Sequence, residues 1–224
     1  MTEAEHIPEA EDAMVRGAFY GSLARAFGPV EESLVSGQAV EELRSLGSAW
    51  PELASSLASL REVAGTEPGD FQALAAERLR LFEKGECPPY EASHRREEDP
   101  LKDVLMADVA GFYRAFGLEP RDDLPDHLVS ELEFMALLCL KEAHARLRDN
   151  QEALEVVLSA QEKFLADHLG RWLEGFREAL LRQSRLDVYP LLVDLLVDFV
   201  RAEMRHLGIP AEETASERGE RRGS

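Results

Sequence analysis

The stretch PDHLVSELEFMALLCLKEA, residues 125–143, decides the fold class because its apolar residues recur every three or four positions. That spacing places them on one face of an α-helix. The same periodicity runs through nearly every segment, and alternating β-branched runs are almost absent, so the sequence predicts an all-α protein. The stripe in the quoted stretch consists of Leu128, Leu132, Met135, Ala136, Cys139 and Ala143.

The other helices are predicted from the same spacing and from glycine and proline at their ends. Gly85 is expected to end one of them, and Met14, Ala18, Leu23 and Phe27 form the predicted apolar stripe of the first. The expected helices span 9–27, 31–46, 51–64, 70–84 and 101–117, and further helices follow with breaks near Asn150, Gly170 and Asp187.

The chain of 224 residues is long enough for one large domain with a substantial core. We therefore predict a single-domain multi-helix bundle over 1–210. Residues 211–224 contain no large apolar side chain, which predicts a disordered tail. Residues 86–101 show no helical stripe and contain three prolines, which predicts a long loop inside the domain.

The charge balance narrows the choice of partners. With 25 basic and 44 acidic residues, the formal net charge is −19. Nucleic acid is a poor partner for such a chain, because phosphate binding depends on clustered cations. A basic partner is favoured, unless the acidity serves only to keep the protein soluble.

The cysteines and the most apolar segment bear on location. Cys87 and Cys139 lack a CxxC spacing, so no zinc site is expected and reduced cytoplasmic thiols are favoured. The N-terminus is acidic where an export signal would be basic. The most apolar segment, 188–200, is too short for a membrane span and contains two aspartates, so no membrane insertion is expected.

The opening turns of the quoted helix admit a structural and a chemical interpretation. His127 and Glu131 are four residues apart and share a helix face, which could form a metal site or a proton relay. Alternatively, Asp126 or Asp123 caps the helix N-terminus and His127 is a half-buried ring bonded to a neighbour such as Glu131. No phosphate-binding, zinc-protease or serine-hydrolase motif is present, so no metal, cofactor or catalytic residue is predicted.

The proline-containing loop also has two interpretations. Pro88 and Pro89 preset an extended backbone, and Tyr90 and Glu91 offer an aromatic anchor and an acceptor, which together could line a peptide groove. The loop could instead merely strap two helix layers together.

Four segments in this order resemble the TorD family of redox-enzyme maturation chaperones. They are LRLFEKGECPPYEAS at 79–93, MADVAGFYRAFGL at 106–118, PDHLVSELEFMALL at 125–138 and FLADHLGRW at 164–172. The resemblance implies an all-helical, non-enzymatic cytoplasmic protein without a cofactor of its own. Its partner would be the apo catalytic subunit of a molybdopterin oxidoreductase of the dimethyl sulfoxide reductase superfamily, in some cases through a twin-arginine signal peptide. It would aid cofactor insertion and delay export of that subunit.

The resemblance also implies which residues contact the client. The motif match transfers this role to Leu81, Phe82, Pro88, Pro89, Tyr90, Glu91, Asp126 and His127. The shared motif is completed by Glu131, Glu133, Phe134 and Met135, which either support the fold or touch the client. Family members commonly have a serine directly after PPYE, whereas here Ala92 precedes Ser93, which leaves the far half of the loop without a matching contact.

Two further questions stay open at this level. An acidic helical adaptor or structural subunit of a stable complex, with no maturation role, would show the same helical pattern and charge. The family resemblance also allows either a monomer or a domain-swapped dimer, with the loop 86–101 as the hinge.

Overall fold

A computed structural model describes residues 3–31, 34, 37–64, 71–94, 101–119 and 125–210. Within these ranges every regular element is a helix, which confirms the predicted all-α fold. A single isolated antiparallel bridge, between Tyr90 and His127, is the only β-type pairing in the described residues. The predicted tail at 211–224 lies outside them.

The elements follow one another with short connections. The α-helices are α1 (Glu3–Phe27), α3 (Gln38–Gly47), α4 (Ala54–Ala64), α5 (Phe71–Arg78), α6 (Lys102–Ala115), α7 (Leu128–Leu147), α8 (Gln151–Phe164), α9 (Gly170–Gln183) and α10 (Val188–His206). Two 3₁₀ turns, η1 (Pro51–Leu53) and η3 (Glu91–Ser93), and two π-helical segments, η2 (Leu79–Glu83) and η4 (Leu165–Leu169), complete the described set.

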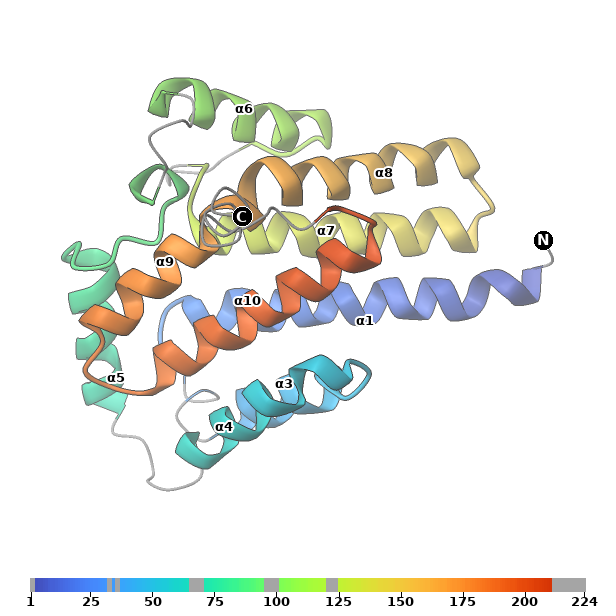
Figure 1. Cartoon of the computed structure of the whole chain (residues 1–224). Helices are drawn as coiled ribbons and strands as arrows, with labels where there is room; N and C mark the ends of the chain where they lie inside the picture. The colour runs from blue at the N-terminus through green and yellow to red at the C-terminus, as the bar shows by residue number, and fades with distance from the viewer. Residues whose placement is uncertain are drawn as a thin grey trace, which may run out of the picture.

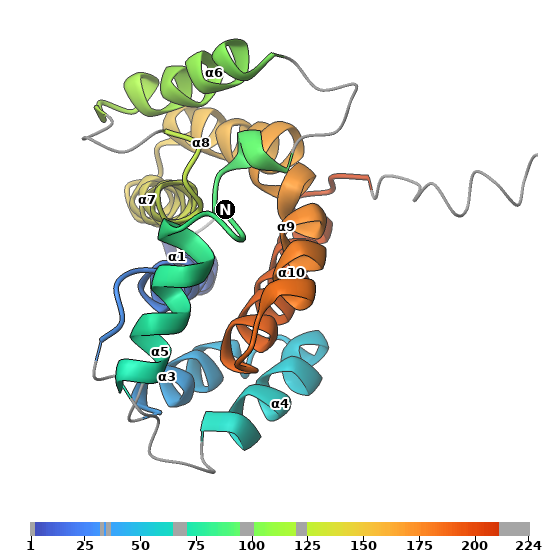
Figure 2. The same cartoon turned by 90° about the vertical axis from the view of Figure 1, so that its left-hand side faces the viewer.

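The helices form a layered bundle around α1 and α7. These two lie side by side along most of their length, and α8 returns along α7 as the second arm of a hairpin (Figure 1). Helices α9 and α10 form a second layer, and α3 and α4 pack beneath α1 and α10 (Figures 1 and 2). Helix α6 lies on the outside of the α7–α8 hairpin at the opposite end of the molecule from α3 and α4 (Figure 2).

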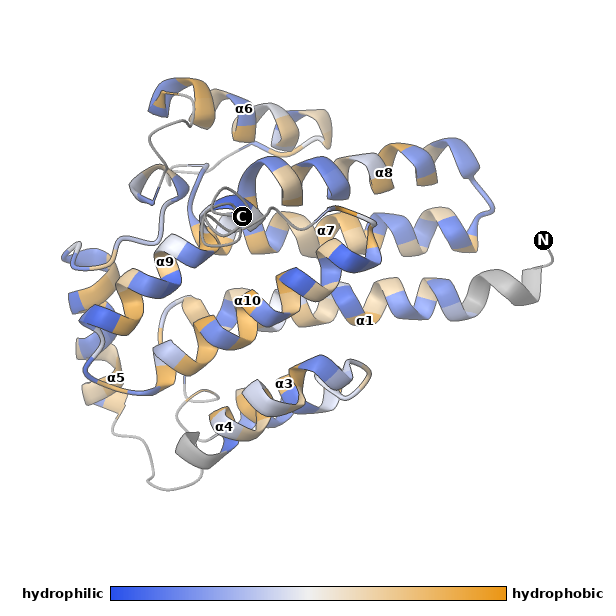
Figure 3. Cartoon of the chain, in the orientation of Figure 1, coloured by the Kyte–Doolittle hydropathy of each residue, from blue (hydrophilic) through white to orange (hydrophobic). Residues whose placement is uncertain are grey.

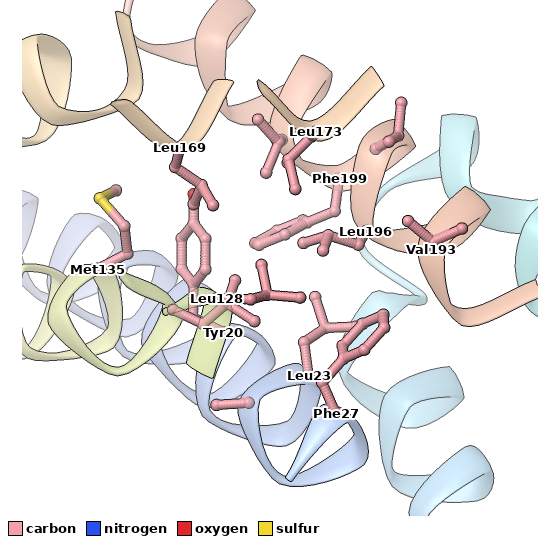
Figure 4. Close-up of a cluster of buried hydrophobic side chains, with 14 of the residues drawn as sticks. Tyr20, Leu23, Phe27, Leu128, Met135, Leu169, Leu173, Val193, Leu196 and Phe199 are labelled. Atoms are coloured by element: carbon pink, nitrogen blue, oxygen red, sulfur yellow. The ribbon is translucent and has the colours of Figure 1, made fainter. Parts of the chain in front are cut away.

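One continuous core joins these layers. Figure 4 shows Tyr20 and Leu23 of α1 meeting Leu128 of α7 and Phe199 of α10 in the centre of the bundle. The apolar residues of the helices alternate with hydrophilic ones along each ribbon, as amphipathic helices require (Figure 3). None of the described helices combines the length and the apolar character needed to cross a membrane.

The predicted stripe of α1 was partly wrong. Met14 is 39% exposed and Ala18 is also exposed, while Ala13, Arg16 and Tyr20 are buried. The buried face is therefore shifted by about one residue at its N-terminal end. The spacing did not reveal this shift, because the buried face includes an arginine.

Arg16 is buried because three polar side chains satisfy its guanidinium. Its Nε donates to Glu203 at 3.1 Å, and its Nη2 donates to Glu142 at 3.1 Å and to Gln161 at 2.5 Å. A charge taken out of water needs such partners, or the desolvation cost is not recovered. The network joins α1 to α7, α8 and α10 inside the bundle.

Helix boundaries were predicted well except around Gly170. Gly85, with a φ of 81°, ends η2, and the breaks near Asn150 and Asp187 are present. At Gly170 the helix does not break: α8 continues through η4 into α9. The Gly170 N–H bonds to the carbonyl of Leu165, and a Cβ at residue 170 would lie 2.5 Å from that oxygen. The glycine therefore allows a π turn instead of ending the helix.

The remaining boundaries differ by a few residues. The predicted helix 31–46 is seen as α3, which starts at Gln38, and residues 32, 33, 35 and 36 lie outside the described ranges. The predicted helix 51–64 begins with the 3₁₀ turn η1. The predicted loop 86–101 contains the 3₁₀ turn η3 in its described half.

Candidate functional site

The proline-containing loop is fastened to the start of α7 by backbone hydrogen bonds. The Glu91 N–H donates to the Asp126 carbonyl at 2.9 Å, and the Leu128 N–H donates to the Pro89 carbonyl at 2.9 Å. These bonds form the bridge between Tyr90 and His127. The structure therefore brings together the two stretches, 88–91 and 126–127, that the sequence had predicted to share one surface.

Asp126 has a different role from the predicted helix cap. It is completely buried, and its Oδ2 accepts a hydrogen bond from the N–H of Ala92 at 3.0 Å. The side chain therefore anchors the loop across 34 residues of sequence. A cap would instead have bonded to the first free N–H groups of its own helix.

His127 occupies the N-cap position of α7. Its Nδ1 accepts from the Val129 N–H at 3.1 Å, so Glu131 is not its partner as had been considered. The ring is half-buried and meets the Tyr90 ring edge to face, with centroids 5.0 Å apart. His127 therefore starts the helix and supports the aromatic residue of the loop.

Glu91, Asp126 and Glu131 form a buried acidic cluster between the loop and α7. Glu131 is fully buried and its Oε2 accepts a hydrogen bond from Trp172 Nε1 at 3.0 Å. Burial and the neighbouring Glu91 carboxylate raise the pKa of Glu131 well above its usual range. The cluster thus concentrates acidity next to a largely apolar core.

His168 of η4 connects this acidic cluster to α6. Its Nδ1 lies 3.2 Å from Glu91 Oε2, and its Nε2 lies 3.5 Å from Asp108 Oδ2. The imidazole is buried, and its Nε2 makes no hydrogen bond within the described part of the chain. Asp108 itself is 66% exposed, so the contact runs from the buried cluster toward the surface.

A cavity of about 200 Å³ opens at this point. Its walls are acidic apart from two apolar side chains of α6, the His168 ring and one arginine. This volume is large enough for a few water molecules or one planar cationic group. The lining consists of Glu91, Val104, Leu105, Asp108, Asp167, His168 and Arg171.

The predicted contact residues differ in their accessibility. Pro88, Tyr90 and His127 are half-buried and Glu133 is exposed, whereas Glu91 is buried but lines the cavity. Fully enclosed are Leu81, Phe82, Pro89 and Asp126, together with Glu131, Phe134 and Met135 of the supporting set.

Leu81 and Phe82 belong to the core in this conformation. The Phe82 ring lies 5.1 Å from the Tyr189 ring and 6.3 Å from the Phe176 ring, measured between centroids. The two side chains therefore offer no surface to a partner unless η2 moves away from α9 and α10.

The residue-by-residue prediction missed His94, His168 and Trp172. The stretch FLADHLGRW contains the latter two at helical spacing, but nothing local shows that they face an acid. His94 Nε2 lies 2.7 Å from the Pro88 carbonyl, and its ring stacks on Trp172 with centroids 5.7 Å apart. His94 therefore holds the far half of the loop against α9.

The alternative of a metal or proton-relay site at His127 and Glu131 finds no support in the geometry. The two side chains bond to different partners, the Val129 N–H and the Trp172 indole. Among the described residues, no group of three or more histidine, cysteine, aspartate or glutamate side chains is arranged to hold a metal ion.

Comparison with known proteins places these features in a family. The model of the nitrate reductase delta subunit family matches residues 44–178. The chain is 41% identical over 116 residues to the chlorate reductase assembly chaperone protein of Ideonella dechloratans, covering 49% of this chain and 58% of that protein. It is 36% identical over 144 residues to the selenate reductase assembly chaperone protein of Thauera selenatis, covering 61% and 72%.

More distant relatives agree with these two. The chaperone protein TorD of Photobacterium profundum is 27% identical over 60% of this chain and 63% of its own length. A solved Archaeoglobus fulgidus structure assigned as a redox enzyme maturation protein is 22% identical, with a TM-score of 0.44, covering 86% of this chain and 93% of that one.

These relatives are named as assembly chaperones and not as catalysts, which confirms the prediction of a non-enzymatic protein. The matched segment spans only 58% of the chlorate reductase chaperone. Because the family model covers more than half of the chain, the protein belongs to the nitrate reductase delta subunit family, and with it to the TorD-type redox-enzyme maturation chaperones.

Proposed function

We propose that the protein is a cytoplasmic chaperone for assembly of a molybdopterin oxidoreductase of the dimethyl sulfoxide reductase superfamily. It would bind the apo catalytic subunit, and the twin-arginine signal peptide where the subunit carries one. Binding would aid cofactor insertion and delay export. The names of the relatives, which refer to chlorate, selenate and perchlorate reductases, support a client of this class.

The observation that carries this proposal is the acidic cavity beside the loop and the start of α7. A guanidinium is planar and forms paired hydrogen bonds with carboxylates, so it fits a small acidic cavity better than an ammonium does. Glu91, Asp108 and Asp167 supply carboxylates from three separate segments. Arg171 also lines the cavity and would compete with an incoming arginine, which favours moderate affinity and release.

The residues next to the cavity suit the rest of a signal peptide. A basic n-region is followed by an apolar segment. Pro88, Tyr90 and His127 are half-buried and present apolar and aromatic edges close to the acidic cavity. Binding an unfolded segment also costs ordering entropy, which limits affinity and suits a transient holder.

The proposal is tested with two synthetic peptides. Both carry the same apolar segment, preceded in one by two consecutive arginines and in the other by two lysines. We expect the arginine peptide to bind more tightly, and the Asp108→Asn/Asp167→Asn double variant to lose about ten-fold in affinity. A control variant, Glu155→Gln/Glu162→Gln, removes two exposed carboxylates from α8 outside the cavity and should bind normally.

Two results would contradict this assignment. Equal binding of the two peptides would remove the guanidinium preference, and equal losses in the test and control variants would reduce the effect to net charge. Association with a client is tested by copurification. A chaperone is absent from the mature enzyme, whereas a stoichiometric component of that enzyme would be an adaptor.

The oligomeric state stays a prediction. A monomer and a domain-swapped dimer hinged at residues 86–101 would share the contacts described above. Light scattering after size-exclusion chromatography distinguishes the two by mass.

A further inference from the structure

A second, chemically different surface lies on the outer side of the α7–α8 hairpin. The hairpin extends past the end of α6, and its far part is not covered by that helix (Figure 1). A groove of about 820 Å³ follows this part of the hairpin, with the end of α6 closing it at Phe116. It shares no lining residue with the acidic cavity.

The floor of the groove is apolar and accessible. Leu140 of α7 is 53% exposed and Val156 of α8 is 56% exposed, and both line the groove together with Phe116. Large exposed apolar side chains are unremarkable when scattered, but a contiguous group framed by polar residues marks an interaction site.

The rim of the groove is basic, which is unusual in a chain of net charge −19. Lys141 and Arg148 line it, and neither forms an ion pair with another described side chain; the Lys141 ammonium instead lies 5.9 Å from the Phe116 ring centroid. By contrast, Arg146 on the same helix pairs with Glu142 at 2.8 Å and with Glu9 at 2.5 Å. The acid that lines the groove is Glu152, in the first turn of α8.

The shape of the groove matches a helix. Its α7 side is formed at residues 140, 141, 144, 145 and 148, a spacing of three and four that keeps them on one face. From residue 140 to residue 148 this face is about 12 Å long, which corresponds to rather more than two helical turns of a docked segment. Two antiparallel helices with an apolar trough between them are a common seat for an amphipathic helix.

We propose that this groove docks an amphipathic helix of a partner protein, with apolar residues at helical spacing and acidic residues along its flanks. The apolar side of that helix would cover Leu140 and Val156, and its carboxylates would meet Lys141 and Arg148. The two cations have no acidic partner in the described structure, so the incoming helix would supply one. The protein would then have an acidic site for a basic segment and a basic groove for an acidic segment.

The probe is a synthetic 18-residue peptide with leucines at helical spacing and glutamates between them, compared with the same peptide carrying lysines. Fluorescence anisotropy with the full chain should show the acidic peptide binding more tightly, and less tightly as salt is added. We expect Lys141→Glu/Arg148→Glu to weaken its binding about ten-fold or more, and Leu140→Ser/Val156→Ser to weaken the binding of both peptides.

A control with the same change in net charge is Lys163→Glu/Arg185→Glu, since both side chains are exposed and outside the groove. This control should bind the acidic peptide within about two-fold of the wild type. Circular dichroism of every variant establishes that the fold is intact.

Three results would overturn the proposal. The first is no binding of the acidic peptide below about 1 mM. The second is equal binding of the acidic and basic peptides by the wild type. The third is a wild-type dimer that Leu140→Ser/Val156→Ser dissociates, which would make the groove an interface between two copies of this chain.

Discussion

Replacing Asp126 by alanine tests whether a single buried carboxylate holds the client-binding loop in place. In the wild type its Oδ2 accepts from the Ala92 N–H at 3.0 Å, while the backbone bond from the Glu91 N–H to the Asp126 carbonyl does not depend on the side chain. The substitution therefore removes one of the attachments between the loop and α7. The backbone attachments remain.

The magnitude follows from three effects. Losing a hydrogen bond to a charged acceptor costs about 1.5–3 kcal/mol. The carboxyl group is completely buried, so its removal leaves a small void that adds about 1 kcal/mol. Against this, Asp126 raises the pKa of nearby Glu131, and removing that repulsion returns about 1 kcal/mol. We expect a net loss of about 2 kcal/mol in the free energy of unfolding.

Urea unfolding followed by circular dichroism measures the global loss. Hydrogen exchange measures the local one, where 2 kcal/mol corresponds to about thirty-fold faster exchange of the Ala92 amide if this amide exchanges through global unfolding. Asp126→Asn is the matched control, because its amide oxygen can still accept from Ala92. It should lose less than about 1 kcal/mol.

Two outcomes would refute the reasoning. A change below about 0.5 kcal/mol for Asp126→Ala would show that the carboxylate is not an anchor, since surface substitutions fall in this range. An equal loss in the asparagine variant would show that the charge, rather than the hydrogen bond, is what matters.

Three further predictions concern other buried groups. Burial beside Glu91 raises the pKa of Glu131, so the stability it contributes is present below the ordinary carboxyl pKa and lost as pH rises through the raised one; Glu131→Gln should exceed the wild type by about 1–3 kcal/mol at pH 8, with a smaller gap at pH 5, in urea titrations. Arg16→Met leaves Glu203 buried without its cation and should cost about 3–5 kcal/mol, part of which Arg16→Met/Glu203→Leu recovers; a double variant less stable than the single one would contradict this. Burial raises the pKa of the Cys87 thiol to about 12, so iodoacetamide should label it only after unfolding, and rapid labelling of the folded protein would contradict its burial.

Local spacing alone predicted the fold class and most helix boundaries. The stripe from Leu128 to Ala143 reports on packing through residues three and four apart, which is information that lies within one helix. The motif order at 79–93 and 125–138 likewise predicted the family and the meeting of the loop with α7. Glycine was less informative, because Gly85 ends a helix whereas Gly170 permits a π turn.

The roles of individual polar residues depended on partners far away in the sequence. Asp126 and His127 were equally suitable as caps, and the choice was made by the Ala92 N–H, 34 residues earlier. Arg16 is buried only because Glu142 and Glu203, 126 and 187 residues later, surround it.

The sequence by itself therefore determined the helical fold, the family and the segments that form the candidate site. Only the tertiary structure decided that Leu81 and Phe82 lie in the core, that His168 joins the acidic cluster, and that two cations flank an apolar groove. Helical periodicity is a property of neighbours along the chain. Burial of a charge is different, because its cost is offset only by groups that folding brings to within hydrogen-bond distance.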